Sequence, residues 1–352
     1  MIERIPPEIG YYLAGFADAE GSFNVSFIAN NEKNKNLSWK VRPCFNVSQK
    51  EKHILTFFQK YLDCGTLSTN KNNVTTFSVV AFKDVGEKVV AFKKRFPFES
   101  TKKRQDFLNF VQILEILEKP VNTLPISDIE RILALRVNTE VIVKNRTYSD
   151  QYLLENWPEP TLIEKIKKSS ETTMPKSESA ENALNDMIES DLCSDTKAAN
   201  AESFYIAGFA DGNGSLNVSF RFRDDYRTAW KISASFSIAQ KDELLLKKFQ
   251  AKLGCGKIRL GSSLGVYYLE VTDQKDLTNK IIPFFKEFQF LSEGNRSRFE
   301  KLCKTVDFLS KGPTYSRSDL EELLSSQRDG SCKSKYTAQE ILARFDTFSE
   351  KR

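Results

Sequence analysis

Histidine and cysteine, two residue types that serve as nucleophiles, general bases and zinc ligands, are few and widely spaced in this chain. The only histidine is His53, so a serine or cysteine nucleophile that relied on histidine as its base would have one candidate. Zinc sites and disulfide frameworks need clustered ligands, and the cysteines form no CxxC pair. They are Cys44, Cys64, Cys193, Cys255, Cys303 and Cys332. We therefore expect any catalysis to use other groups.

A repeated nonapeptide carries an acid in one copy and an amide in the other. LAGFADAEG (13–21) recurs as IAGFADGNG (206–214), and its eighth residue changes from Glu20 to Asn213. The repeat continues, because WKVRPCFNVSQKEK matches WKISASFSIAQKDE and YLDCGTL matches KLGCGKI. A repeat of this period in a chain of 352 residues predicts a duplicated domain.

The elements that must position these residues form an α+β unit in each copy. After each nonapeptide, apolar and polar residues alternate with period two, which predicts half-buried strands. Segments such as KEKHILTFFQKYL and RQDFLNFVQILEILEK carry apolar residues at helical spacing. We expect the order helix, two strands, helix, two strands, helix, with the helices covering one face of an antiparallel sheet.

The opposite face of each predicted sheet is rich in Arg, Lys, Asn, Ser and Gln and poor in acids. Such side chains bind phosphates and base edges in a major groove that admits a β-ribbon. An ordinary solvated face is the alternative for each strand alone, but it would mix charge signs. The candidate DNA-binding residues are Asn24, Ser26, Lys40, Arg42, Asn46, Asn217, Ser219, Arg221, Arg223, Lys231, Lys257 and Arg259.

The composition along the chain predicts where the two halves, the linker between them and the C-terminal tail begin and end. We expect a first half at 1–168, an acidic flexible linker at 169–203, a second half at 204–330 and a C-terminal tail at 331–352. The linker holds eight acids and two lysines, a net charge of −6, so the remainder of this +5 chain carries +11. A linker of about 35 residues reaches roughly 30 Å, enough to join two adjacent lobes of a monomer. No apolar run is long enough to cross a membrane.

The two nonapeptides, each followed by the same strand, Trp-Lys, Gln-Lys and Cys-Gly signals, resemble the LAGLIDADG homing endonucleases in their single-chain, two-motif form. The resemblance implies a pseudo-symmetric saddle of two αββαββα halves whose antiparallel sheets face double-stranded DNA at a long target site. Small residues such as Gly15 and Gly208 would let the two motif helices pack closely, with the eighth residues meeting at the helix ends.

The resemblance also implies a catalytic site. Glu20 matches the acid that binds Mg²⁺ or another divalent cation, which activates water for phosphodiester hydrolysis. The second copy departs from this pattern, because Asn213 offers a neutral amide oxygen as metal ligand and Asn295 stands where the first half has a lysine. The candidate catalytic residues are Glu20, Asn213, Gln49, Gln240 and Lys103. Asp18 and Asp211, the sixth motif residues, are expected to cap a helix end or to pack.

Three functions stay open at this point. The first is a metal-dependent, site-specific DNA endonuclease with its second half impaired by Asn213. The second is a group I intron RNA maturase, with intron RNA as partner, and the third is a DNA-binding protein that does not cleave. The family implies an intron-encoded protein of an organelle, chloroplast or mitochondrion, with a bacterial cytoplasm as the alternative.

Overall fold

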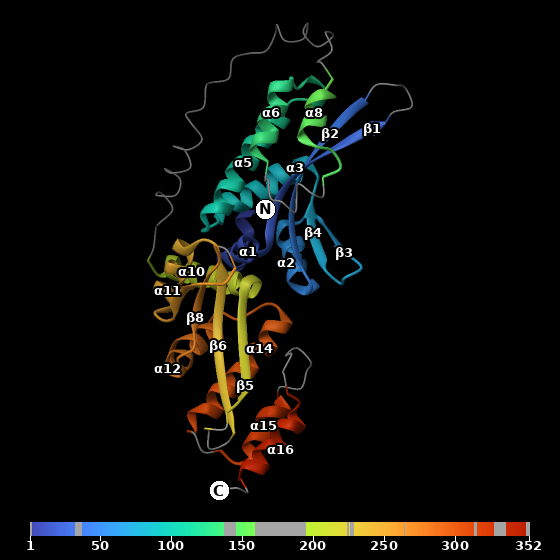
Figure 1. Ribbon diagram of the computed structural model, residues 1–352. Coiled ribbons are helices and arrows are strands. Elements are labelled where there is room, and N and C mark those ends of the chain that lie inside the picture. The colour runs from blue at the N-terminus through green and yellow to red at the C-terminus, as the bar shows by residue number, and fades with distance from the viewer. Residues whose placement is uncertain are drawn as a thin grey trace. The chain divides into compact units, whose positions relative to one another are not determined.

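The chain consists of two compact units, Met1–Glu202 and Ser203–Arg352. A computed structural model describes residues 2–31, 37–136, 146–158, 195–223, 225, 229–263, 265–312, 315–326 and 336–349. Each unit holds a four-stranded antiparallel sheet with helices, so the predicted α+β class and the duplication are confirmed. Figure 1 colours the first unit from blue to green and the second from yellow to red.

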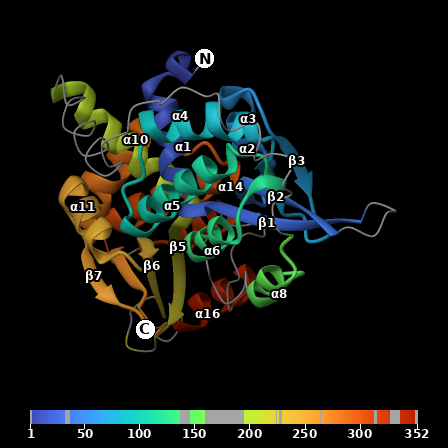
Figure 2. The same ribbon diagram turned by 90° about the horizontal axis from the view of Figure 1, so that it is seen from above.

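The first unit contains two β-hairpins separated by a helix. Its sheet has the strand order β1-β2-β4-β3. Its elements are η1 (Ile2–Arg4), α1 (Pro7–Glu20), β1 (Gly21–Asn31), β2 (Leu37–Gln49), α2 (Lys52–Leu62), β3 (Thr66–Thr69), β4 (Thr75–Val79), α3 (Phe82–Asp84), η2 (Val85–Val90), α4 (Ala91–Arg95), α5 (Thr101–Leu117), η3 (Val121–Thr123), α6 (Ile126–Leu135) and α8 (Asp150–Glu155). Helix α2 packs on β2, β3 and β4, and Figure 2 shows α2 near β2 and β3.

The second unit repeats this order, with the strands arranged β5-β6-β8-β7. Its elements are α10 (Asp195–Asn213), β5 (Gly214–Phe222), β6 (Trp230–Gln240), α11 (Glu243–Leu253), β7 (Lys257–Leu260), β8 (Tyr267–Val271), α12 (Gln274–Asp276), η6 (Leu277–Ile281), α13 (Ile282–Glu287), α14 (Glu293–Ser310), α15 (Arg317–Ser326) and α16 (Ala338–Ser349). In both units a helical stretch that the sequence did not predict, α3 to α4 and α12 to α13, precedes the last helix of the repeat.

Two helices lie inside segments that were predicted as linker and tail. Helix α10 begins at Asp195, within 169–203, and its Ser203 is buried. Residues 169–194 of that predicted linker lie outside the described residues. Helix α16 lies within 331–352 and buries Ile341 and Phe345 in a hydrophobic cluster of the second unit. The second unit, Ser203–Arg352, therefore includes the predicted tail, and α10 crosses the boundary between the two units.

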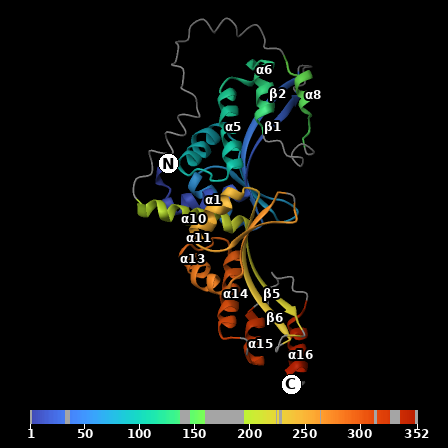
Figure 3. The ribbon, with the colours of Figure 1, turned by 60° about the vertical axis from the view of Figure 1, so that its left-hand side comes forward.

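Alternation along the long hairpins separates a buried face from a polar one. Phe23 and Phe27 of β1 are buried, and so are Val41 and Phe45 of β2, while their even-numbered neighbours are partly or fully exposed. The antiparallel register pairs Phe23 with Phe45, so the apolar residues lie on the same face. Helix α5 runs along β1, and α14 runs along β5 and β6 (Figure 3). The predicted half-buried strands are confirmed.

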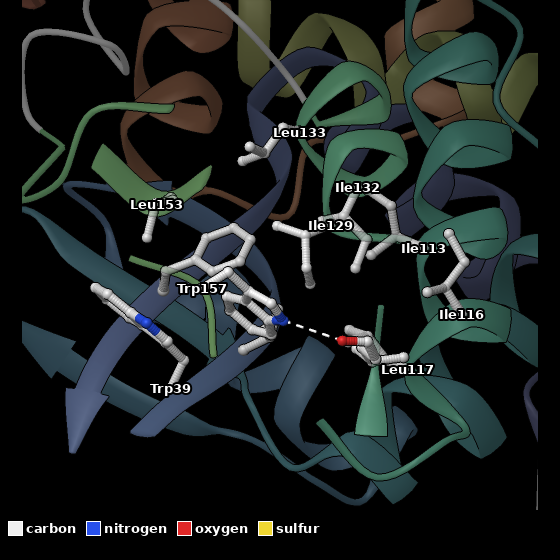
Figure 4. Close-up of a cluster of buried hydrophobic side chains, with 12 residues drawn as sticks. Trp39, Ile113, Ile116, Leu117, Ile129, Ile132, Leu133, Leu153 and Trp157 are labelled. Atoms are coloured by element: carbon white, nitrogen blue, oxygen red, sulfur yellow. Dashed lines mark hydrogen bonds between the residues drawn. The ribbon is translucent and has the colours of Figure 1, made fainter. Parts of the chain in front are cut away.

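A hydrophobic cluster packs the turn end of the β1–β2 hairpin against the helices that follow the repeat. Trp39 of β2 stacks on Trp157 with ring centroids 6.4 Å apart, and the Trp157 indole donates a hydrogen bond to Leu124 O at 3.0 Å (Figure 4). Helix α6 contributes Ile129 and Ile132 to this cluster. Each large apolar side chain buried there stabilises the fold by about 1.5 to 3 kcal/mol.

The second unit has the corresponding cluster. The indole of Trp230 donates to Ile341 O of α16 at 3.0 Å, as Trp39 donates to Asn156 O at 3.1 Å in the first unit. In both units, helices that follow the repeat thus hold the hairpin that carries the polar face. Among the described helices, none combines the length and the apolar composition that crossing a bilayer requires.

Candidate active site and nucleic-acid interface

The motif glycines place the eighth motif residue at the end of a helix in both units. Helix α1 ends at Glu20 and β1 begins at Gly21, while α10 ends at Asn213 and β5 begins at Gly214. The Gly21 N–H caps Ala17 O, and a Cβ atom at Gly21 would collide with that same oxygen. Only glycine therefore lets the chain turn directly from helix into strand at this point.

The sixth motif residues anchor the motif helix to the last helix of the repeat. The buried carboxylate of Asp18 accepts hydrogen bonds from the backbone N–H groups of Glu99 and Ser100, at 3.2 and 2.9 Å, and from the Ser100 hydroxyl. Ser100 directly precedes α5, so these bonds satisfy donors at the start of that helix. The predicted structural role of Asp18 is confirmed.

Asp211 makes the same set of contacts in the second unit. It accepts from the N–H groups of Leu291 and Ser292, at 3.1 and 2.9 Å, and from the Ser292 hydroxyl, just before α14. The nonapeptide is thus a structural motif as well as a carrier of the eighth residue. The second copy keeps the hydrogen bonds of the sixth residue, although its eighth residue is Asn213 and not an acid.

The structure brings Lys103 to the end of the first motif helix. The Lys103 ammonium, at the start of α5, donates a hydrogen bond to the carbonyl oxygen of Gly21, the residue after Glu20. Burial raises the pKa of the Glu20 carboxyl, and the charge of Lys103 partly opposes this shift. Burial lowers the pKa of Lys103, against the attraction of Asp18 and Glu20. An acid and a base therefore share a partly desolvated position.

Gln49 and Gln240 occupy equivalent positions where the second strand of each unit ends. Strand β1 starts at Gly21 opposite Val47, so Gln49 lies two residues further along β2, near the start of β1. The Gln49 Oε1 atom accepts from Lys50 N at 2.7 Å, and the Gln240 Oε1 atom accepts from Lys241 N at 2.6 Å. In both units the side-chain oxygen of this glutamine thus accepts a hydrogen bond from the backbone N–H of the residue that follows the strand.

The second half lacks the acid and base of the first. Asn213 ends α10, and Asn295, the counterpart of Lys103, is only 7% exposed. Asn295 donates through Nδ2 to the carbonyl oxygen and to Oδ1 of Asp211, at 2.9 and 2.8 Å. Its side chain therefore binds the motif helix and does not repeat the Lys103 contact.

A buried lysine near the first site was missed by the sequence analysis. Lys93 is 1% exposed, its Nζ has no hydrogen-bond partner, and it lies 3.7 Å from the centroid of the Phe98 ring. The second half has Phe285 at this position, stacked on Phe290 at 4.5 Å. The repeat offset that aligns Phe98 with Phe290 would have revealed a lysine at a core position.

Replacing Lys93 with methionine is expected to stabilise the first unit. Burial lowers the pKa of Lys93 far below its ordinary value, with Asp18 opposing the shift. The unfolded chain therefore binds a proton that the folded chain lacks, so the free energy of unfolding rises with pH until the ordinary lysine pKa is reached. Lys93→Met should remove that rise, which is at most about 1.4 kcal/mol per pH unit, and add about 2 kcal/mol at neutral pH.

Thermal melting between pH 7 and about pH 10 measures both effects. The exposed neighbour gives the matched control, since Lys94→Met should leave the melting temperature and its pH dependence unchanged. A lower melting temperature for Lys93→Met would show that the ammonium stays charged and that its contact with Phe98 outweighs desolvation.

The predicted DNA-binding residues of the first unit share one face of the sheet. The register places Ser26 opposite Arg42 and puts Asn24 and Asn46 on the same side of the hairpin. All of these side chains are at least partly exposed, as is Lys40. The first face therefore has the polar, positively charged character that the sequence predicted.

The second unit places its predicted residues in the same way. Arg221 lies directly opposite Lys231, and Ser219 opposite Ser233, while Asn217 lies further along β5. Lys257 and Arg259 lie on β7, the edge strand of the sheet. Arg223 directly follows the end of β5.

Acids on the second face correct the prediction that both faces are poor in them. Glu270 of β8 lies opposite Lys257 and accepts from the Arg259 Nε at 2.9 Å, and Arg259 also lies 4.8 Å from the Tyr268 ring centroid. Arg223 forms two hydrogen bonds with Asp225, both at 2.8 Å. Acids therefore bind two of the predicted arginines. The pair of Arg259 with Glu270 was not predicted, because the sequence alone did not show which residues of β8 lie opposite β7.

Comparison with models of protein families identifies the family to which the two repeats belong. A model of the LAGLIDADG endonuclease family matches residues 13–114 and, a second time, residues 206–306. The chain belongs to the LAGLIDADG endonuclease family. Each match begins in a motif helix and ends in α5 or α14, so the predicted resemblance and its two motifs are confirmed.

Relatives and solved structures agree with this assignment. A Mycosarcoma maydis protein, "Probable intron-encoded DNA endonuclease 1", is 31% identical over 283 residues, which cover 80% of this chain and 93% of that protein. "Probable intron-encoded endonuclease 3" of Neurospora crassa is 21% identical over 284 residues, or 79% of this chain and 46% of that protein. The chain spans 46% and 56% of the lengths of two Neurospora crassa relatives.

Among solved structures, the I-SmaMI LAGLIDADG homing endonuclease bound to cleaved DNA is similar with a TM-score of 0.69. The two chains are 21% identical, and the similarity covers 95% of this chain and 99% of that one. At this level of identity the comparison establishes the fold.

Proposed function

We propose that this protein is a site-specific DNA endonuclease that binds a long double-stranded target and hydrolyses a phosphodiester there. The observation that carries the proposal is that Glu20 and Lys103 interact at the end of α1, where β1, a strand of the polar face, begins. Membership of the endonuclease family, the intron-encoded endonucleases among its relatives and a neighbour bound to cleaved DNA support it. Both halves lie in one chain, so we propose that it acts as a monomer and that an intron of an organelle genome encodes it.

The donor set of the first half fits Mg²⁺. Among the described residues, no group of three or more His, Cys, Asp or Glu could enclose a metal ion. Mg²⁺ commonly binds through one or two carboxylates, keeps several waters and takes phosphate oxygens of the substrate as further ligands. One carboxylate at the end of a helix, Glu20, is therefore sufficient, and the bound ion would supply a water of lowered pKa and neutralise charge on the phosphate.

The protein's own groups have distinct parts in the proposed reaction. The sheet faces position the duplex, Glu20 holds the cation and Gln49 presents its amide donors at the end of β2. In its protonated form Lys103 would place a positive charge next to Glu20, where it would stabilise the negative charge that develops on the phosphate. Asn213 supplies no such carboxylate and Asn295 no such charge, so we propose that the first half cuts one strand and that the second half chiefly binds.

Selection from a randomised duplex library, followed by a plasmid assay, tests this proposal. The enriched sequence is placed in a supercoiled plasmid and incubated with Mg²⁺, and we expect open-circular product nicked in one strand. Enrichment without nicking would favour a DNA-binding protein that does not cleave. Failure to enrich any duplex, together with binding of the host intron RNA, would favour the maturase.

Arginines with and without an acid partner are expected to contribute unequally to DNA binding. Arg221 lies among basic and polar residues, whereas Glu270 already binds Arg259. Arg221→Ala should weaken binding by about tenfold, equivalent to about 1.4 kcal/mol, and should flatten the salt dependence by about 0.9 in log-log slope.

Titration of the selected duplex at several salt concentrations measures the affinity and the salt slope of Arg221→Ala and of Arg259→Ala. Arg259→Ala should change affinity less, because the phosphate must compete with Glu270 for that guanidinium. Equal effects of the two substitutions would show that the pair with Glu270 opens on DNA.

A further inference from the structure

The last helices of the two repeats carry their charges at different positions. Where α5 has Lys103 and, one turn later, Asp106, α14 has Asn295 and Arg298 at the equivalent positions. Residues three apart on a helix lie on the same side, so α14 carries its cation one helical turn later than α5 does and has no carboxylate there. The second half therefore keeps a positive charge near its motif helix.

Contacts in the second unit tie this charge to the motif. The Nη1 of Arg298 donates to the Oδ1 of Asn295 at 2.8 Å, and Asn295 donates in turn to the carbonyl and carboxylate oxygens of Asp211. Asp211 lies two residues before Asn213. Hydrogen bonds through Asn295 and Asp211 thus connect the guanidinium to the end of α10. Asn295 is buried, so it holds the Arg298 side chain at a defined position.

The remaining donors of Arg298 are available to a ligand. Arg298 is exposed, and within the described parts of the chain its guanidinium forms this one hydrogen bond and no ion pair. By contrast, acids bind Arg223 and Arg259 in the same unit. A guanidinium offers five N–H donors in a planar fork that matches the geometry of a phosphate.

We propose that Arg298 binds a backbone phosphate of the DNA strand held by the second half, and that Asn295 positions it. This inference rests on the proposed DNA-binding function and names the residue that maintains contact where the acid and the lysine are missing. Arginine stays charged at every pH that the protein experiences, so it binds the phosphate and transfers no proton. The second half would then hold its strand tightly although it cuts it poorly.

Binding of the selected duplex by the full chain tests the proposal. Arg298→Ala should weaken binding by about tenfold and flatten the log-log salt slope by about 0.9, the loss of one phosphate contact. Arg298→Lys, which keeps the charge, should retain most of the slope, whereas Arg298→Gln, which keeps a donor for Asn295, should not. The matched control is Arg296→Ala, an exposed arginine of the same helix, which should change neither quantity.

A neutral methylphosphonate, introduced at one phosphate at a time, locates the contact. We expect one position, in the strand that the first half does not nick, where the unmodified chain loses affinity and Arg298→Ala loses no more. Unchanged affinity and slope of Arg298→Ala, in a protein whose unmodified form binds and nicks, would overturn this inference alone. A chain that binds no duplex at all would overturn the proposed function and this inference together.

Discussion

Glu20→Gln is expected to abolish nicking of the target plasmid and to leave binding of the duplex unchanged. Glutamine has nearly the same size and shape, so α1 and its turn into β1 are preserved, but its amide oxygen brings no negative charge to a divalent cation. Metal assistance is worth several kcal/mol, and each 1.36 kcal/mol is a factor of ten in rate, so we expect a loss of at least about 10³-fold.

The exposed acid of the same helix provides the control, since Glu8→Gln should nick like the unmodified chain. Burial raises the pKa of Glu20, so the nicking rate should begin to fall, as the pH is lowered, above the ordinary glutamate value of 4.5. Nicking at an undiminished rate by Glu20→Gln would show that another group binds the metal and that the assignment of Glu20 is wrong.

The repeat made most of the fold predictable. The period-two pattern predicted the long hairpins, and their register is as the apolar residues require, because a slip by one residue would turn Phe23 and Phe45 to the solvent. The nonapeptide glycine marked the end of each motif helix. These features are local in sequence, so a single chain contains the information needed to predict them.

Features that depend on contacts between distant segments were not predictable in the same way. The pairing of Arg259 with Glu270 depends on the register of β7 with β8, and the burial of Lys93 depends on where α4 packs. The sequence comparison placed Asn295 at the position of Lys103, but it did not show that the shorter side chain turns to Asp211. That contact preserves the structure of the motif while the chemistry changes.

Asn213→Glu is expected to increase the rate at which the second strand is cut. The substitution restores the acid of the first motif at the same helix end, directly before Gly214, so the backbone already has the required turn. Because Asp211 makes the contacts that Asp18 makes, the helix that carries the new carboxylate is held in the same way. We expect the rate on the second strand to rise by about 10- to 100-fold, a fraction of what a metal site can contribute.

Restoring the base requires more than one change. Asn295→Lys alone would break the bonds to Asp211 and would put two cations one helical turn apart, since Arg298 follows. The triple variant Asn213→Glu, Asn295→Lys and Arg298→Asp reproduces the first-half set of Glu20, Lys103 and Asp106. It should cut the second strand faster than Asn213→Glu at saturating protein, although it binds the duplex more weakly.

End-labelling each strand separately, in Mg²⁺ and with protein in excess over the duplex, measures the two rates independently. Asn213→Gln is the control, because it lengthens the side chain without adding charge and should leave the rate on the second strand as it is in the unmodified chain. Equal and rapid cutting of both strands by the unmodified chain would show that an amide oxygen suffices as metal ligand. An uncut second strand in the triple variant, with the first strand still nicked, would show that the second half differs from the first in more than these three side chains, and that its remaining role is to hold the DNA.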